Sequence, residues 1–185
     1  MELFEAIHTR QSIGKVKPDS VPRELIEKLL SAAVQAPNHH KVRPWRFIVL
    51  TGAGRERLGE VMAASIKKRK PEVEELALNA ERAKFLRAPL LIAVGVDKPV
   101  EAKVVELENI CAAAAAAQNI LLAAHGLGLA AHWRTGAAAT DPDVKAFLGL
   151  QADQHLIAFL YIGYPLTEPV VRNRPSFEDR THWLD

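Results

Sequence analysis

The chain has 185 residues, about the length of one domain, and its 49% apolar and 25% charged residues are typical of a globular protein. That composition excludes intrinsic disorder and collagen-like repeats, and a net charge of +2 is too even to indicate nucleic-acid or membrane binding. The single cysteine, Cys111, excludes an intrachain disulfide and a cysteine-based metal site.

Apolar patterning predicts the element order α-α-β-α-α-β-α-β-α-β, followed by a polar tail from residue 165. Helical spacing predicts helices over residues 2–9, 22–35, 55–70, 72–86, 101–125 and 141–149. Continuous apolar runs predict strands over residues 47–50, 90–96, 129–132 and 156–162. Gly126 is expected to cap the long helix, and Asp141 to begin the last one. Such strands have both faces covered, so we expect an α+β fold, a three-layer α/β/α sandwich around a small sheet.

The composition has one unusual feature, which is a shortage of aromatic residues beside an excess of alanine. Aromatic residues make up 6%, and six alanines follow one another at 112–117. A core built from alanine has little volume, so it must bring backbones close together or share its core with another subunit. The apolar stretch 110–124 is also shorter than a membrane span, and the N-terminus has no signal-peptide core, so we expect a cytoplasmic protein.

The best-known site motifs are absent or incomplete. There is no P-loop and no G-x-S-x-G. Gly52 and Gly54 follow a strand as in a dinucleotide turn, but the third glycine is missing, so we interpret them as a strand-to-helix turn. His39 and His40 are adjacent and have no partner at ligand spacing, so no metal site is expected.

Three short segments carry more polar chemistry than folding alone requires. In the first, Arg10 and Ser12 place a cationic fork and a hydroxyl on one loop after the first helix. This combination suits phosphate or another oxygen-rich ligand. The alternative is a solvated helix C-terminus, where arginine is common.

The other two segments are a loop at 36–45 and the sequence HWRTG at 132–136. The loop is stiffened by two prolines and is rich in polar donors, although an ordinary connection remains an alternative. HWRTG follows a predicted strand, and open α/β sheets bind ligands at the carboxyl ends of strands. Its side chains could stack on and hydrogen-bond a planar heterocycle; the alternative is a polar turn in which Trp133 fills the core.

Together the three segments resemble the FMN-dependent nitroreductase family, specifically its short branch of NAD(P)H nitroreductases. The pattern is an early R-x-S, an A-P-[ND]-H…P-W loop and a W-R-[ST]-G about ninety residues later. The helix start VPRELIE at 21–27 and LYIGYP at 160–165 also fit. The order and spacing of the motifs make the match specific, and it covers nearly the whole chain.

The resemblance implies a single nitroreductase-like FMN-binding domain over 1–185, with a small mixed sheet and a C-terminal tail that reaches the partner of a homodimer. FMN would lie non-covalently in the interface, where Arg10 binds its phosphate and Gln11 and Ser12 meet the ribityl chain or pyrimidine edge. The opposite chain would contribute Gln35, Pro37, Asn38 and His39 beside the flavin. The ring and phosphate side would be lined by Trp133, Arg134, Thr135 and Gly136. The nicotinamide side would be formed by His125, Gly126, Leu127 and Gly128.

One departure from the family concerns charge. Typical members have a second arginine where this chain has Gln11, and Arg172 or Arg174 in the tail could add charge near the phosphate. The long helix would form the dimer core, and the variable stretch 67–87 could form a lid.

The resemblance implies ping-pong hydride transfer from NAD(P)H through FMN to a nitroaromatic, quinone or similar planar acceptor. The flavin would carry the chemistry, so no catalytic side chain and no metal are expected. A non-catalytic flavin- or nucleotide-binding dimer, a flavin reductase with a different acceptor, and a structural helical scaffold remain alternatives.

Overall fold

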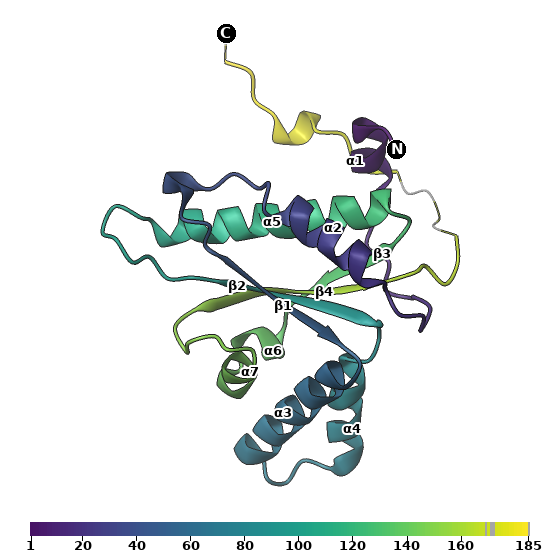
Figure 1. The fold of residues 1–185 in the computed structure, drawn as a ribbon, viewed down its shortest axis with the longest axis vertical. Helices are drawn as coiled ribbons and strands as arrows, with labels where there is room; N and C mark the ends of the chain where they lie inside the picture. Colours follow the sequence, from purple (N-terminus) through teal and green to yellow (C-terminus); the bar gives the residue numbers. More distant parts are fainter. Residues whose placement is uncertain (169, 171–172, 185) are drawn as a thin grey trace.

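A computed structural model describes residues 1–168, 170 and 173–184. At its centre lies a four-stranded sheet in the order β1-β2-β4-β3. The strands are β1 (Trp45–Thr51), β2 (Leu90–Val96), β3 (Ala130–Arg134) and β4 (His155–Gly163). Helices cover both faces of this sheet, so the expected α/β/α sandwich is confirmed (Figure 1).

The sheet is antiparallel throughout, and the expectation of a mixed sheet is wrong. The long helix between β2 and β3 is a crossover that leaves these two strands pointing the same way. Because β4 is inserted between them, every neighbouring pair is antiparallel. A parallel contact does occur as an isolated bridge between Ser12 and Ala131, at the β3 edge.

The helices divide unequally between the two faces of the sheet (Figure 1). The first face packs against α2 (Arg23–Ala33) and α5 (Glu106–Gly126). The second face is covered by α3 (Ala53–Arg69), α4 (Glu75–Lys84), α6 (Ala137–Thr140) and α7 (Pro142–Phe147). The short α1 (Leu3–Thr9) lies near the end of α5, and the 3₁₀ turns η1 (His39–Lys41) and η2 (Glu178–Arg180) lie in the connections.

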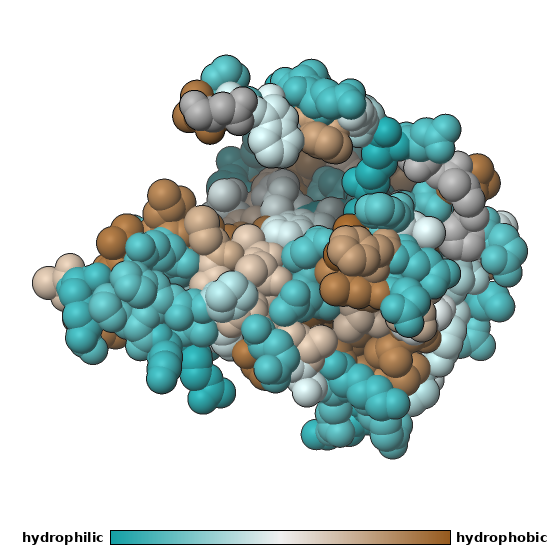
Figure 2. Space-filling model, turned by 90° about the horizontal axis from the view of Figure 1, so that it is seen from above, coloured by the Kyte–Doolittle hydropathy of each residue, from teal (hydrophilic) through white to brown (hydrophobic). Residues whose placement is uncertain are grey.

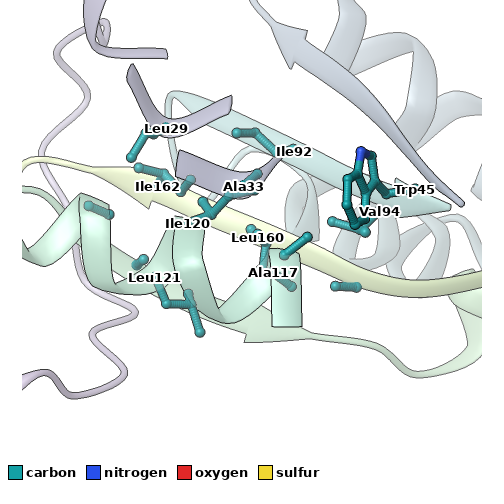
Figure 3. Close-up of a cluster of buried hydrophobic side chains, with 14 of the residues drawn as sticks. Leu29, Ala33, Trp45, Ile92, Val94, Ala117, Ile120, Leu121, Leu160 and Ile162 are labelled. Carbon is teal, nitrogen blue, oxygen red and sulfur yellow. The ribbon is translucent and has the colours of Figure 1, made fainter. Parts of the chain in front are cut away.

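The alternation of side chains along β2 builds two cores from one strand. Leu90, Ile92 and Val94 pack toward α2 and α5, in the cluster where Figure 3 labels Ile92 and Val94. Leu91 and Ala93 pack toward α3 and α7 on the other face. The strand is buried along its whole length, as the continuous apolar run predicts. The edge strand β1 is different, because several of its residues are exposed.

The alanine run serves mainly the chain's own core. Ala112, Ala113, Ala116 and Ala117 are buried against the sheet, and only the pair 114–115 faces partly outward. Small side chains therefore let α5 approach its own sheet and α2. These four alanines are therefore buried by the chain itself, and the expectation that the long helix forms a dimer core remains a prediction.

The long helix is capped by a glycine two residues later than the predicted one. Gly126 is its last residue, and Gly128 takes the left-handed conformation, with φ +74°. The backbone N–H of Gly128 donates to His125 O at 3.0 Å, and that of Leu129 donates to Ala124 O at 2.8 Å. These two bonds form a Schellman motif, in which glycine is favoured at the left-handed position.

By length and composition alone, α5 would pass as a membrane-crossing helix, and 44% of its apolar window is buried inside the protein. A helix at the core of a folded domain meets the same criteria. Its buried side packs against the sheet and α2.

Candidate functional site

The first predicted segment begins where α1 ends. Arg10 follows directly after Thr9, and the chain then runs along the outer edge of β3. The backbone N–H of Ile13 donates to Ala131 O at 3.0 Å, which fixes this course. A Cβ atom added at Gly14 would lie 2.9 Å from His132 Nδ1, so the first segment also lies close to the third.

Arg10 lines a cavity of about 580 Å³, called here the Arg10 pocket. This volume lies within the usual range of small-molecule sites. The pocket is formed by the end of α1, the 10–12 loop, the end of α5 and the C-terminal tail. It is lined by Met1, Glu5, His8, Thr9, Arg10, Gln11, Ser12, His125, Asn173, Arg174 and Pro175.

Two guanidinium groups meet in the Arg10 pocket. Arg174 Nη2 donates to Arg10 O at 2.9 Å, and neither arginine has an ion-pair partner among the described residues. Burial and the neighbouring charge of Arg174 both lower the pKa of Arg10. Glu5 also lines the pocket, but it is not paired with either arginine, and two such unpaired cations favour a bound anion.

The tail is also fastened to the first segment through Gln11. Its amide Nε2 donates to Val170 O at 2.8 Å. Gln11 therefore anchors the tail in this structure, and Arg174 supplies the second cation of the pocket. Arg172, the other tail arginine considered from the sequence, lies outside the described residues.

His125 was expected on the nicotinamide side with residues 126–128, and the structure places it in the Arg10 pocket. Its Nε2 lies 2.7 Å from Thr9 Oγ1. Gly126 is the last residue of α5, and Leu127 and Gly128 form its cap, so these three do not line the pocket. Glu5 is a pocket residue that the sequence did not single out, and Thr9, which begins the first segment, was given no role there. Nothing local in the sequence links either residue to the distant end of α5.

The second segment lies at the opposite end of α5. His39 Nδ1 is 2.7 Å from Glu108 Oε2 in the first turn of that helix. Asn38 Oδ1 accepts a hydrogen bond from the backbone N–H of Arg43 at 2.9 Å. Gln35 lies two residues beyond the end of α2, and its side chain reaches back to Ser31 O in that helix. Neither of the two cavities lined by the other two segments includes Gln35, Pro37, Asn38 or His39.

The loop of the second segment is conformationally strained. His40, Lys41 and Arg43 all have positive φ values, between +52° and +56°. Such residues each cost of order 1–3 kcal/mol, and they are enriched at binding sites. The sequence could not show this strain, because none of the three is a glycine.

The length of α5 separates the first and second segments. At a rise of 1.5 Å per residue, Glu108 and His125 lie on the order of 25 Å apart along the helix axis. The two ends are visible in Figure 1, with α1 at one end of α5 and the connection before β1 at the other. Within one chain, the two segments cannot surround the same small molecule.

The third segment divides between core and surface. Trp133 is half-buried, packs on the α5 side of the sheet and donates from Nε1 to Ile157 O at 3.0 Å. It therefore fills the core, as its alternative interpretation expected. Because the sheet is antiparallel, the rule for carboxyl ends of parallel strands does not apply to this segment.

Arg134, Thr135 and Gly136 line a second cavity, of about 340 Å³. The Arg134 guanidinium lies over the Tyr161 ring, 5.8 Å from its centroid. Burial raises the pKa of Tyr161, against the opposing charges of Arg134 and Arg87. Gly136 has φ +84° and ψ −162°, a conformation that is nearly exclusive to glycine, and it begins α6.

The described residues contain no cluster of three or more His, Cys, Asp or Glu side chains that could hold a metal. Arg10 and Arg174 give the Arg10 pocket an excess of positive charge over the single carboxylate of Glu5, and Thr9 and Ser12 add hydroxyl groups. The pocket suits an anionic organic ligand with a phosphate group.

Comparisons with known proteins give matches over most of the chain. The family model described as "Nitroreductase family" matches residues 7–164. A Bacillus subtilis protein provisionally named as the NAD(P)H nitroreductase YfhC is 33% identical, over 96% of this chain and 92% of its own. The nitroreductase-like protein of Bacillus cereus has a crystal structure with a TM-score of 0.85 and 25% identity, covering 100% of this chain and 97% of that one.

A further solved structure contains a flavin. It is a protein from Desulfovibrio desulfuricans, provisionally named a nitroreductase and crystallised in complex with FMN. Its TM-score is 0.73 at 27% identity, and the match covers 96% of this chain and 94% of that one.

Proposed function

The chain belongs to the nitroreductase family, and on this premise we propose that it is an FMN-dependent NAD(P)H oxidoreductase. The proposed acceptors are nitroaromatics, quinones or similar planar molecules, reduced in a ping-pong reaction. The FMN complex of the D. desulfuricans relative and the NAD(P)H nitroreductase name of the B. subtilis relative support the two cofactors. The proposal treats residues 1–185 as one FMN-binding domain.

The observation that carries this proposal is the pair of cations in the Arg10 pocket. Arg10 and Arg174 are close enough for their charges to interact, and neither is paired with a carboxylate among the described residues. A phosphate monoester would supply up to two negative charges and three acceptor oxygens to these guanidinium groups. The donor set therefore fits the phosphate of FMN.

We propose that two chains form each complete site. The second segment is on the order of 25 Å from the Arg10 pocket along α5, so a partner must supply it if both segments contact one flavin. The apolar side of α1 supports this arrangement, because Leu3, Phe4 and Ile7 are 64%, 73% and 44% exposed. Exposed apolar patches of this kind mark interaction surfaces.

Other exposed apolar residues extend the same surface. Leu107 on α5 is 66% exposed, and Trp183 in the tail is 76% exposed. Figure 2 shows this side of the molecule from above, with strongly apolar side chains among residues of intermediate hydropathy. The surface is hollowed beneath the tail. A homodimer built on α1, the outer side of α5 and the tail would cover these residues.

When bound, FMN supplies the hydride chemistry between NAD(P)H and the acceptor. The chain's own residues bind and orient it. Arg10 and Arg174 would hold its phosphate, Ser12 would provide a hydroxyl beside them, and the turn at Thr135 and Gly136 would line the ring side. Trp133 positions that turn from the core through its bond to Ile157. A cytoplasmic location belongs to the same proposal, because the lone cysteine leaves no intrachain disulfide to form.

The test begins with the colour of the protein. Purified protein should be yellow and release FMN on denaturation, and apoprotein that cannot bind added FMN would contradict the proposal. NADH and NADPH should each be screened against a nitroaromatic, a quinone and free flavin in steady state. Bleaching of the bound flavin by either nicotinamide, and reoxidation by the nitroaromatic or quinone, are the expected results. Binding without bleaching would instead indicate a non-catalytic flavin-binding dimer, and reoxidation by other acceptors alone would indicate a related flavin reductase.

A further inference from the structure

His125 occupies a position in the Arg10 pocket that the proposed function does not explain. It lies in the last turn of α5, half-buried, and shares the pocket with Arg10 and Arg174. Its ring is held by Thr9, whose Oγ1 is 2.7 Å from Nε2. The side chain is thus fixed at the edge of the cationic cavity.

The hydrogen bonds of Thr9 determine which ring nitrogen of His125 carries the proton. Thr9 Oγ1 lies 2.6 Å from Glu5 O, and a carbonyl oxygen can only accept, so the single hydroxyl hydrogen is donated there. Toward His125 the hydroxyl oxygen must therefore accept, and Nε2 must carry the hydrogen. In the neutral ring, Nδ1 is then an unprotonated acceptor, and it has no hydrogen-bond partner among the described residues.

Without an anion, the surroundings of His125 disfavour protonation of its ring. Burial lowers the pKa of His125, Arg10 lowers it further, and Glu5 on α1 opposes them. His8 on α1 and Arg174 in the tail are the other ionisable side chains that line the pocket. An anion bound beside Arg10 would cancel the repulsion that now disfavours the imidazolium, and the C-terminal end of a helix favours a cation.

We propose that His125 is a third ligand of the FMN phosphate and that phosphate binding places a proton on its Nδ1. The proton comes from solvent when the phosphate enters and returns to solvent when it leaves. Nδ1 then becomes a donor beside the two guanidinium groups, while Nε2 keeps its bond to Thr9. This inference rests on the proposed function, because it concerns the same phosphate site.

The consequence is a flavin affinity that depends on pH through one side chain. The advantage of the wild-type chain over His125→Gln should be small at pH 8.5, where the ring stays neutral. It should grow to about tenfold or more at pH 6, since a hydrogen bond to a charged group is worth about 1.5–3 kcal/mol. Glutamine can still contact Thr9 but cannot titrate.

The test uses titration calorimetry to measure how many protons the protein takes up when FMN binds. FMN is titrated into full-length apoprotein at pH 7 in two phosphate-free buffers with different ionisation enthalpies, for wild type, His125→Gln and His8→Gln. We expect the net proton uptake of the wild type and of His8→Gln to exceed that of His125→Gln. The ionisation of the FMN phosphate itself contributes equally to all three and cancels in the comparison. Riboflavin, which lacks the phosphate, should show no such difference.

Equal proton counts in wild type and His125→Gln, or the loss of uptake in His8→Gln alone, would overturn the proposal. In that case FMN still binds, and the proposed function stands. Failure of all three proteins to bind FMN would instead contradict the proposed function. If His125→Gln does not fold, the His125 ring can be titrated by NMR in the wild type. A pKa that rises when FMN saturates the protein supports the proposal, and an unchanged or lower pKa refutes it.

Discussion

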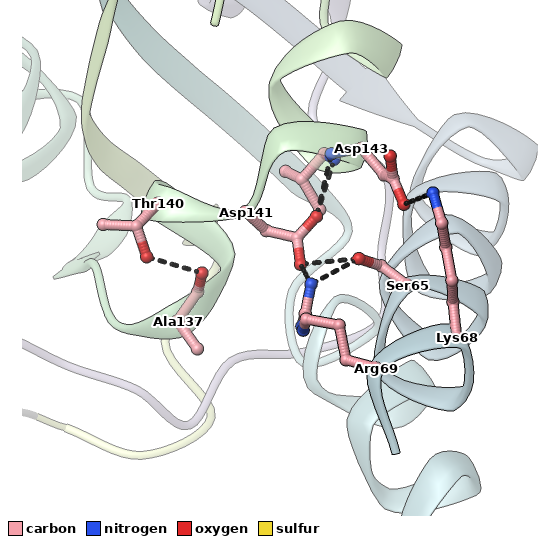
Figure 4. A network of polar contacts seen from close by, with 8 residues as sticks. Ser65, Lys68, Arg69, Ala137, Thr140, Asp141 and Asp143 are labelled. Carbon is pink, nitrogen blue, oxygen red and sulfur yellow. Dashed lines mark hydrogen bonds and ion pairs between the residues drawn. The ribbon is translucent and has the colours of Figure 1, made fainter. Parts of the chain in front are cut away.

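The Arg69 guanidinium lies 2.5 Å from the buried carboxylate of Asp141, and this contact fastens α3 to the first turn of α7 (Figure 4). Ser65 Oγ donates to the same carboxylate oxygen at 2.8 Å. The other oxygen of Asp141 accepts from the backbone N–H groups of Asp143 and Val144, and so caps α7. One carboxylate therefore joins two helices on the face of the sheet opposite α5.

Replacement of Asp141 by Asn should destabilise the protein by about 3 kcal/mol, because it removes the charge that pairs with Arg69 in a buried network. The free energy of unfolding from urea denaturation at pH 7 measures this. Asp143→Asn is the matched control, since its 3.9 Å contact with Lys68 is exposed and should cost less than about 0.5 kcal/mol. Equal losses in the two variants would contradict this assignment.

The loss of stability caused by Asp141→Asn should depend on pH. Burial works to raise the pKa of Asp141, but the hydrogen bonds from Arg69, Val144 and Ser65 outweigh it, and the pKa lies below its usual value. The stabilisation is therefore complete above the unfolded-state pKa of about 3.9 and is lost as the pH falls through the folded-state value. The difference in stability between wild type and Asp141→Asn should be constant from pH 7 to 5 and shrink below about pH 4. If the difference in stability between the two proteins already disappears at pH 6, a group other than Asp141 is responsible.

Gly136→Ala should destabilise the turn of the third segment by about 1–3 kcal/mol, because φ +84° with ψ −162° is strained for any residue with a Cβ atom. Gly126→Ala provides the control. Gly126 has helical conformation, and a Cβ atom added there would have nothing within 4 Å, so alanine should be neutral or stabilise by up to about 1 kcal/mol. Chemical denaturation of both apoproteins measures the difference, and FMN titration shows whether the turn also affects the flavin.

Arg10→Ala should weaken FMN binding at least tenfold, since a charge-assisted hydrogen bond contributes about 1.5–3 kcal/mol. Riboflavin affinity should change much less, because it has no phosphate. Quenching of flavin fluorescence gives both constants. Arg23→Ala, which removes an exposed arginine paired with Glu27 on α2, should bind FMN like the wild type. Unchanged FMN affinity in Arg10→Ala would rule out the role assigned to Arg10.

Phe4→Glu should shift the protein from dimer to monomer and reduce FMN retention in parallel, because it places a charge in the proposed interface. Leu76→Glu is the control: Leu76 is 79% exposed on α4, outside that surface, and its replacement should leave the dimer intact. Sedimentation velocity with simultaneous detection of flavin absorbance reports both properties. A wild-type protein that sediments as a monomer with bound FMN would contradict the shared site.

The sequence predicted the helices and strands where the pattern was local and long. The buried runs of β2 and β4 and the helical spacing of α2 and α5 specify their elements directly. The direction of the strands was not predictable in this way, because the insertion of β4 between β2 and β3 is a property of the whole topology. The short α6 was missed, since its four residues AAAT are too few to show periodicity.

How much of the candidate site could be predicted from the sequence differs among the three segments. Arg10 was expected at a phosphate, and the choice between Arg172 and Arg174 as a second cation was left open; in the structure Arg174 contacts the backbone oxygen of Arg10. The pairing of Thr9 with His125 joins residues 116 positions apart and leaves no local signal. Trp133 illustrates a real ambiguity, because an aromatic residue after a strand suits both a core and a ligand, and only its bond to Ile157 decides between them.

Because the length of α5 separates the first and second segments, two defective subunits should be able to complement each other in a mixed dimer. On the proposed arrangement, each flavin site combines Arg10 of one subunit with Asn38 of the other. A dimer that joins one Arg10→Ala subunit to one Asn38→Ala subunit would contain one site with both defects and one site with neither. The two variants, unfolded and refolded together, should then regain activity in the mixed dimers, up to half that of a wild-type dimer.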